Sequence, residues 1–165
     1  MIHIRPFEPR DAQAVAAVIL PIQRQEFGIP ITLDAQPDLA DVSGFYQRDR
    51  GNFWIAEVDA TVVGTIGLLD IGAGAAALRK MFVSAPHRGK AHGVARLLLA
   101  ELLAWSAGKG LGRIYLGTTD KFLAAHRFYE QNGFKEIARA DLPGSFPIMA
   151  VDSKFYLRSL GSGAA

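Results

Sequence analysis

The segment from Met81 to Arg96 constrains the fold of this chain more than any other part of the sequence. An apolar stretch with the pattern of a strand stops at Pro86, a basic loop spaced by glycines follows, and an apolar helix is expected from Val94. Such a loop directs unpaired backbone N–H groups toward one point at the positive end of a helix dipole. The segment therefore predicts an anion site, and a phosphate or diphosphate is its most natural occupant.

The residues of this loop support the same interpretation. Arg88, Lys90 and Arg96 add positive charge, while Gly89 and Gly93 let an anion approach the backbone without meeting a Cβ atom. The alternative is an ordinary strand-to-helix connection with solvated basic side chains. On the loop alone, the anion site is favoured by roughly two to one.

Length and composition indicate one globular domain. The 165 residues are half hydrophobic and 21% charged, which is enough to bury a core, so we expect a domain over residues 1–160 and a flexible tail over 161–165. The net charge of +2 is too small to indicate a nucleic-acid partner. Because the chain has no cysteine, disulfides, thiolate zinc sites and a cysteine nucleophile are excluded.

The N-terminal stretch has no signal-peptide pattern, and the longest apolar runs, such as residues 12–22, are too short and interrupted to cross a bilayer. We therefore expect a cytoplasmic protein without a membrane partner. The four histidines lack metal-ligand spacing, so no metal is expected and each is assigned to the surface or a loop. They are His3, His87, His92 and His126.

Hydrophobic spacing and turn residues predict alternating strands and helices. Strands are expected at residues 2–5, 52–58, 61–70, 76–83, 114–118, 134–138 and 148–157. A helix is expected after Asp11, ending at Pro21 or, at the latest, before Gly28, and further helices are expected at residues 36–48, 94–107 and 123–131. This order predicts a mixed α/β or α+β fold.

A second informative segment runs from Ala125 to Phe134. Phe128 and Tyr129 stand side by side near the end of a predicted helix, and Gly133 follows as its exit. By itself this aromatic pair is an ordinary packing feature, by roughly three to one. Together with the basic loop, however, it makes the chain resemble the GNAT superfamily of acetyl-CoA-dependent N-acetyltransferases.

The resemblance has three parts that occur in the family's order. Leu78–Val83 resembles its fourth strand, Arg88–Gly93 resembles its pyrophosphate loop with the pattern Gln/Arg-x-x-Gly-x-Gly/Ala, and Ala125–Phe134 resembles its later helix and exit. The predicted order of strands and helices agrees with that of the family over nearly the whole chain. The resemblance implies a mostly antiparallel mixed sheet of about six or seven strands flanked by about four helices, acetyl-CoA as co-substrate, and a homodimer.

The chain departs from the family's pattern at three positions. Ala91 replaces the central glycine of the loop pattern, Phe122 stands where many members carry an asparagine that touches the cofactor, and Ala77 stands where many carry a glutamate as general base. If the position of Ala91 requires a positive φ, its Cβ costs about 1–2 kcal/mol. No carboxylate can act from Ala77.

The family's mechanism implies roles for particular residues. Acetyl passes directly from acetyl-CoA to the amine of a small molecule, and Tyr129 protonates the leaving thiolate as general acid. A purely structural tyrosine keeps roughly one chance in three. The residues expected to contact the cofactor are Met81, Phe82, Val83, Arg88, Gly89, Lys90, Ala91, His92, Gly93, Val94, Phe122 and His126.

The sequence indicates the residues that bind the acceptor amine less clearly than those that bind the cofactor. Three distant carboxylates could take the amine proton, and Glu26 ranks ahead of Glu57 and Asp70. The reason is that Glu26 and its neighbour Phe27 lie in the region that lines the family's acceptor pocket. For each of the three carboxylates, a solvated surface role is favoured by roughly four to one. Strand alternation places Arg79 on the face of Ala77, which would suit an acceptor bearing a carboxylate. An ordinary ion pair of Arg79 is the slightly favoured alternative.

Three functions therefore stay open. The first is acetylation of a small amine, the second is acetylation of a peptide or protein by the same fold, and the third is a non-catalytic acyl-CoA-binding module. Tyr129 argues against the third, because a pure binder needs no acid. A dinucleotide-binding loop at Gly72–Ala77 is disfavoured, since a strand-like run follows it instead of a helix.

Overall fold

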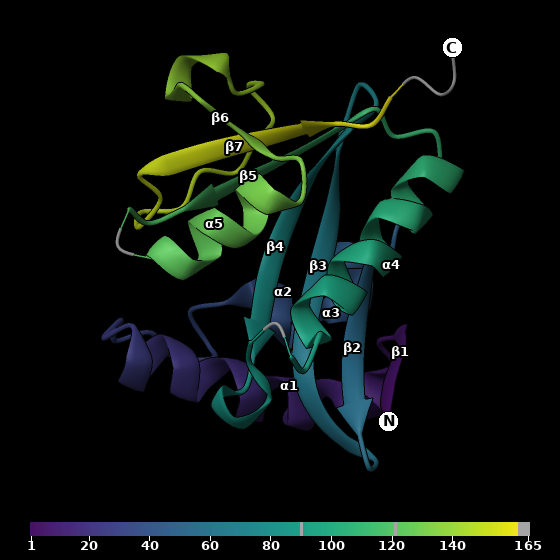
Figure 1. The fold of residues 1–165 in the computed structure, drawn as a ribbon, viewed down its shortest axis with the longest axis vertical. Coiled ribbons are helices and arrows are strands. Elements are labelled where there is room, and N and C mark those ends of the chain that lie inside the picture. The colour runs from purple at the N-terminus through teal and green to yellow at the C-terminus, as the bar shows by residue number, and fades with distance from the viewer. Residues whose placement is uncertain (90, 121, 162–165) are drawn as a thin grey trace.

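The structure is a computed structural model that describes residues 1–89, 91–120 and 122–161. Over these residues, seven strands form one open sheet in the order β1-β2-β3-β4-β5-β7-β6, and β4–β5 is its one parallel pairing (Figure 1). The predicted mixed, mostly antiparallel sheet is confirmed. The strands are β1 (Ile2–Pro6), β2 (Asn52–Val58), β3 (Thr61–Gly72), β4 (Ala75–Val83), β5 (Arg113–Thr118), β6 (Lys135–Ile137) and β7 (Lys154–Ser159).

Helices cover both faces of this sheet, with α4 and α5 on one side and α1, α2 and α3 on the other (Figure 1). Their bounds are α1 (Ala12–Pro21), α2 (Pro37–Ala40), α3 (Val42–Tyr46), α4 (Val94–Gly108) and α5 (Leu123–Gln131). A π-helical turn, η2 (Ile22–Glu26), continues α1 beyond its proline. In this part of the chain no helix is both long enough and apolar enough to cross a membrane.

The core consists of a buried cluster on each face of the sheet. On one face, Ile66 of β3 and Leu98 of α4 are fully buried in the same cluster. On the other, Phe53 of β2, Ile19 of α1 and Tyr46 of α3 are buried together. Because both faces are covered, the strands carry the near-continuous apolar runs seen in the sequence.

The separation of β4 from β5 positions the candidate site. Their parallel pairing extends only from Ala75 to Ala77 on β4 and from Arg113 to Tyr115 on β5. Beyond it the two strands diverge (Figure 1), while β3 still pairs with β4 as far as Val83. The β5-facing backbone edge of β4 is therefore left without its strand partner over residues 78–83.

Two predicted elements were wrong in their extent. The helix expected over residues 36–48 is two short helices, because Asp41 leaves helical geometry and its carboxylate caps α3 by accepting the N–H of Gly44 at 3.0 Å. The last strand was expected from Ile148 but begins at Lys154. The residues before it form an exposed turn in which Asp152 accepts the N–H of Met149, so their apolar pattern does not reflect pairing.

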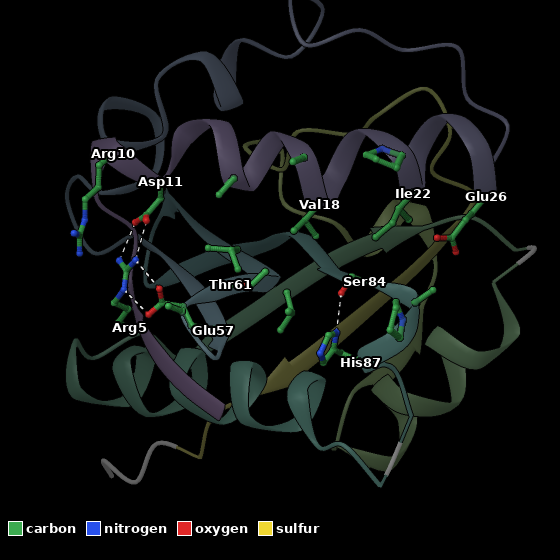
Figure 2. A pocket seen from close by; sticks show the side chains of 18 residues that line it. Arg5, Arg10, Asp11, Val18, Ile22, Glu26, Glu57, Thr61, Ser84 and His87 are labelled. Carbon is green, nitrogen blue, oxygen red and sulfur yellow. Dashed lines mark hydrogen bonds and ion pairs between the residues drawn. The ribbon is translucent and has the colours of Figure 1, made fainter. Parts of the chain in front are cut away.

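An ionic cluster joins β1, β2 and the start of α1. Arg5 donates to both carboxylate oxygens of Asp11 at 2.8 Å and to Glu57 at 3.0 Å (Figure 2). Asp11 is buried, and the hydrogen bonds from Arg5 lower the pKa of its carboxyl. A carboxyl whose pKa is lower in the folded state stabilises the protein above its unfolded-state pKa, and this contribution disappears as pH falls.

We therefore expect Asp11→Asn to lower the free energy of unfolding by about 2 kcal/mol at pH 7, with a loss that shrinks below about pH 4. Urea unfolding of both proteins at pH 7 and pH 3 measures this. The exposed Asp34→Asn serves as the control and should change neither value. An equal loss from Asp11→Asn at both pH values would contradict the ionic explanation.

Candidate active site

Two glycines of the loop between β4 and α4 have left-handed backbone conformations. Gly89 and Gly93 adopt positive φ values of 103° and 73°, which side chains with a Cβ rarely adopt. Lys90, also predicted to contact a cofactor, lies outside the described residues.

The first turn of α4 offers backbone donors. Gly93 is the N-cap and has no side chain that could bond these amides, and the first intrahelical bond reaches from Leu97 to the carbonyl of Gly93 at 3.0 Å. The N–H groups of residues 94–96 precede that bond and therefore have no acceptor within the helix. With the dipole of a 15-residue helix behind them, they form an anion-binding geometry.

Arg88 and Glu26, predicted for different roles, form an ion pair with each other. The guanidinium of Arg88 bonds both carboxylate oxygens of Glu26, with Nη2 to Oε2 at 2.8 Å, and its Nε donates to the carbonyl of Val83 at 2.7 Å. Arg88 thus ties the loop to η2 and to the end of β4. The hydrogen bonds from Arg88 lower the pKa of Glu26, which weakens that carboxylate as a base.

Tyr129 reaches from α5 to the side chain of Met81 on β4. Its hydroxyl lies 3.9 Å from Sδ of Met81, a weak acceptor and the one hydrogen-bond partner it has among residues 1–89, 91–120 and 122–161. Its ring packs against Phe134 and Tyr156. Burial raises the pKa of Tyr129, so the phenol keeps its proton at neutral pH.

Three aromatic side chains from distant segments meet beside this edge. Phe27, which follows η2, stacks on Phe122 at the start of α5 with ring centroids 3.9 Å apart, and it lies 6.3 Å from the ring of Phe82 on β4. The structure thus brings together two residues predicted to bind cofactor and one predicted to bind acceptor.

His126, by contrast, is an interior residue. It is only 5% exposed, and its Nε2 lies 2.8 Å from the carbonyl of Thr119. The expectation that it would be a surface or loop histidine was wrong, because the turn of α5 that carries it packs against Tyr156. Its predicted contact with a cofactor stays a prediction.

On the opposite face of β4, Ala77 is fully buried beside Tyr115 and Phe155. Arg79 lies on the same face, as strand alternation predicted, with its guanidinium carbon 5.6 Å from the ring of Phe45 in α3. No carboxylate stands where the family's usual base would be.

Lys80 was not predicted to belong to this site. Simple alternation would place it opposite Arg79, but a bulge with φ of 54° at Lys80 turns its side chain to the same side, and both cations reach the buried Asp38. Nothing in the local sequence indicates the bulge.

Asp152, just before β7, is a second residue that the sequence did not reveal. One of its carboxylate oxygens accepts the N–H of Met149 at 2.9 Å. A Cβ on Gly117 of β5 would come within 2.6 Å of that oxygen, so the glycine permits this close approach. Burial raises the pKa of Asp152 above its ordinary value, which makes it a stronger base than a solvated aspartate.

A separate open groove of about 820 Å³ lies between α1 and the segments at residues 60–63 and 84–87 (Figure 2). The Arg5–Asp11–Glu57 cluster lies at one end of its lining and Glu26 at the other, with Ser84 and His87 between them. Of the carboxylates considered in the sequence for the amine proton, Glu26 and Glu57 line it. The groove therefore does not coincide with the loop amides, Tyr129 or Arg79.

Comparison with known proteins places these features in a family context. The sequence profile of the Acetyltransferase (GNAT) family matches residues 18–134, which include β4, the loop and α5. An acetyltransferase of the GNAT family from Staphylococcus aureus Mu50 superimposes with a TM-score of 0.91 at 39% identity, covering 96% of this chain and 99% of that one. An acetyltransferase from Streptococcus agalactiae gives a TM-score of 0.90 at 31% identity, covering 96% and 98%.

Curated relatives match over a shorter span. N-acetylaspartate synthetase from Homo sapiens is 33% identical over 112 residues, 65% of this chain and 36% of that protein. N-acetyltransferase 8B from Rattus norvegicus is 33% identical over 105 residues, 60% of this chain and 46% of that protein. The matched part of this chain thus spans between about a third and a half of each of these two relatives.

Proposed function

The chain belongs to the GNAT acetyltransferase family, and on that premise we propose that it transfers an acetyl group from acetyl-CoA to the amine of a small molecule. The observation that carries the proposal is the edge of β4 left free where β5 diverges. The amides of α4 lie at the far end of this edge, and the Tyr129 hydroxyl lies beside Met81 within it. A long thioester carrier with a diphosphate fits this arrangement.

In this proposal the cofactor's diphosphate binds the loop and the amides of residues 94–96. Its pantetheine arm adds to the edge of β4 at residues 81–83 as a further strand would. A backbone N–H of that edge polarises the thioester carbonyl and stabilises the oxyanion. Proteins of similar fold that were crystallised with coenzyme A, such as N-acetylglutamate synthase from Neisseria gonorrhoeae at 19% identity, support this through their fold.

The reaction then needs two proton transfers. The neutral amine attacks the thioester carbon, the tetrahedral intermediate collapses with cleavage of the C–S bond, and the departing thiolate takes the proton of Tyr129. The amine proton needs an acceptor elsewhere, because Ala77 occupies the position of the family's usual glutamate base. Glu26 is the candidate from the sequence, weakened by its bond to Arg88, and Asp152 is the candidate from the structure, strengthened by burial.

A small acceptor is favoured over a peptide by the relatives, because N-acetylaspartate synthetase is named for a small acetylated amine. The dimer, the cytoplasmic location and the other cofactor contacts predicted from the sequence remain part of this proposal.

The proposal is tested in two steps on the whole protein. Calorimetric titration with coenzyme A should show binding tighter than about 1 mM, and acetyl-CoA with a panel of small amines should release coenzyme A above the background rate. Folded protein that gives no heat at millimolar ligand would overturn it. Binding without release on any amine or peptide would instead support the acyl-CoA-binding module, and release on peptides alone would support a peptide acetylase.

A further inference from the structure

A buried cluster with two cations and one carboxylate lies where β4 packs against α2 and α3. Oδ2 of Asp38 lies 3.6 Å from Nζ of Lys80 and 4.0 Å from Nη2 of Arg79, and it accepts the hydroxyl of Tyr46 at 2.6 Å. The side chains of Asp38, Lys80 and Arg79 are only 5%, 9% and 13% exposed. Within this cluster a single carboxylate therefore serves both cations.

Arg79 is the cation of this cluster with unused donors. Lys80 donates to the side-chain oxygen of Gln36, but Arg79 has one hydrogen bond among the described residues, from Nη2 to the weak acceptor Sδ of Met149 at 3.5 Å. In the same part of the chain, every fully buried side-chain nitrogen or oxygen has a hydrogen-bond partner. The unpaired Nε and Nη1 of Arg79 therefore face space that a solvent molecule or a ligand can reach.

The guanidinium is also held in place by aromatic rings. Its carbon lies 5.6 Å from the ring centroid of Phe45 and 6.0 Å from that of Tyr46, which is fully buried. Cation–π contacts of this kind fix the orientation of the guanidinium without using its N–H groups. A planar donor group that is preorganised, with Nε and Nη1 unpaired, matches the geometry of a carboxylate.

The position of Arg79 relates this donor group to the proposed reaction. It lies two residues from Ala77 on the same face, and the edge proposed to hold the thioester follows directly beyond the bulge at Lys80. At about 3.3 Å per residue, that edge begins within about 10 Å of Arg79. Asp152 adds a carboxylate to the same region: burial raises its pKa, and the positive charge of Arg79 partly offsets that rise.

We propose that Arg79 binds a carboxylate of the acceptor, so that the acceptor is a small amino acid or a related amine that bears a carboxylate. This rests on the proposed function and names the substrate class of the same site. Lys80 and Asp38 position Arg79 and set the local charge.

The test compares matched acceptors by release of coenzyme A from acetyl-CoA. The standard amino acids are assayed against their α-carboxamides, and aspartate and glutamate also against asparagine and glutamine. The wild-type protein should prefer the carboxylate form of its best acceptor by about 100-fold in kcat/KM. Arg79→Gln should reduce this preference by about 10- to 100-fold, mainly through KM, and Arg79→Lys should reduce it less because the charge remains.

Arg10→Gln is the matched control, since its side chain is 72% exposed before α1, and it should leave the preference unchanged. Equal wild-type rates with acids and amides would overturn the inference and leave the proposed function intact, whether or not the variants fold. If a folded Arg79→Gln protein lost kcat/KM equally on the carboxylate and carboxamide acceptors, the inference would also be overturned and the proposed function would stay intact. Binding of coenzyme A without turnover of any amine would overturn the proposed function itself, and this inference with it.

Discussion

Replacing Tyr129 with Phe is expected to lower kcat by about 100-fold or more, with little change in the affinity for coenzyme A. The substitution removes one buried hydroxyl beside Met81 and keeps the ring that packs against Phe134. The phenol carries its proton at neutral pH, as a donor must, while burial raises its pKa and makes it a weaker acid than a solvated tyrosine. Steady-state release of coenzyme A, combined with calorimetric titration of the ligand, measures both effects.

Tyr156→Phe is the matched control for that experiment. Tyr156 is fully buried next to Tyr129, but its hydroxyl donates to Glu130 at 2.8 Å instead of reaching the edge of β4. Its loss should lower the free energy of unfolding by about 1 kcal/mol and leave kcat within about threefold. A Tyr129→Phe protein with kcat as high as this control would show that the Tyr129 hydroxyl is structural.

The second large effect is expected at the N-terminus of α4. Gly93→Ala should weaken binding of coenzyme A by about 10-fold or more, because the new Cβ stands at the helix end where the diphosphate is proposed to approach. The φ of 73° also strains any residue with a Cβ, at a cost of about 1 kcal/mol in stability. Calorimetry gives the affinity, and urea unfolding gives the stability.

Gly110→Ala separates these two effects. Gly110 follows the opposite end of α4 and has nearly the same φ, 76°, with no atom within 4 Å of a Cβ placed there. It should therefore lose a similar amount of stability while binding coenzyme A as the wild type does. If both variants bound coenzyme A with wild-type affinity, the diphosphate would have to be held elsewhere.

The parts of the fold that the sequence predicted well are those with local causes. Strands β2, β3 and β4 follow apolar runs that end at turn residues, and α4 begins after Gly93 and ends at glycine. The loop between β4 and α4 was predicted as an anion site because its chemistry depends on adjacent residues. The site residues of that loop could therefore be named before their geometry was known.

The acceptor side had no such local signal. Asp38, Arg79 and Lys80 meet only because α2 folds onto β4 and because a bulge reverses one step of strand alternation. Asp152 lies in a segment whose apolar neighbours resembled a strand, and Glu26 could not be seen to pair with Arg88, which lies 62 positions away.

Apolar periodicity, glycine placement and capping residues act over a few positions along the backbone, so the order of elements and the glycine-spaced loop before α4 were decided within the chain's own local sequence. Which charges are paired and which stay available depends on contacts between segments far apart in the chain. The packing of α1, α2 and α5 around β4 decided that Arg88 is paired with Glu26, that Arg79 keeps unused donors, and that the Tyr129 hydroxyl lies beside Met81.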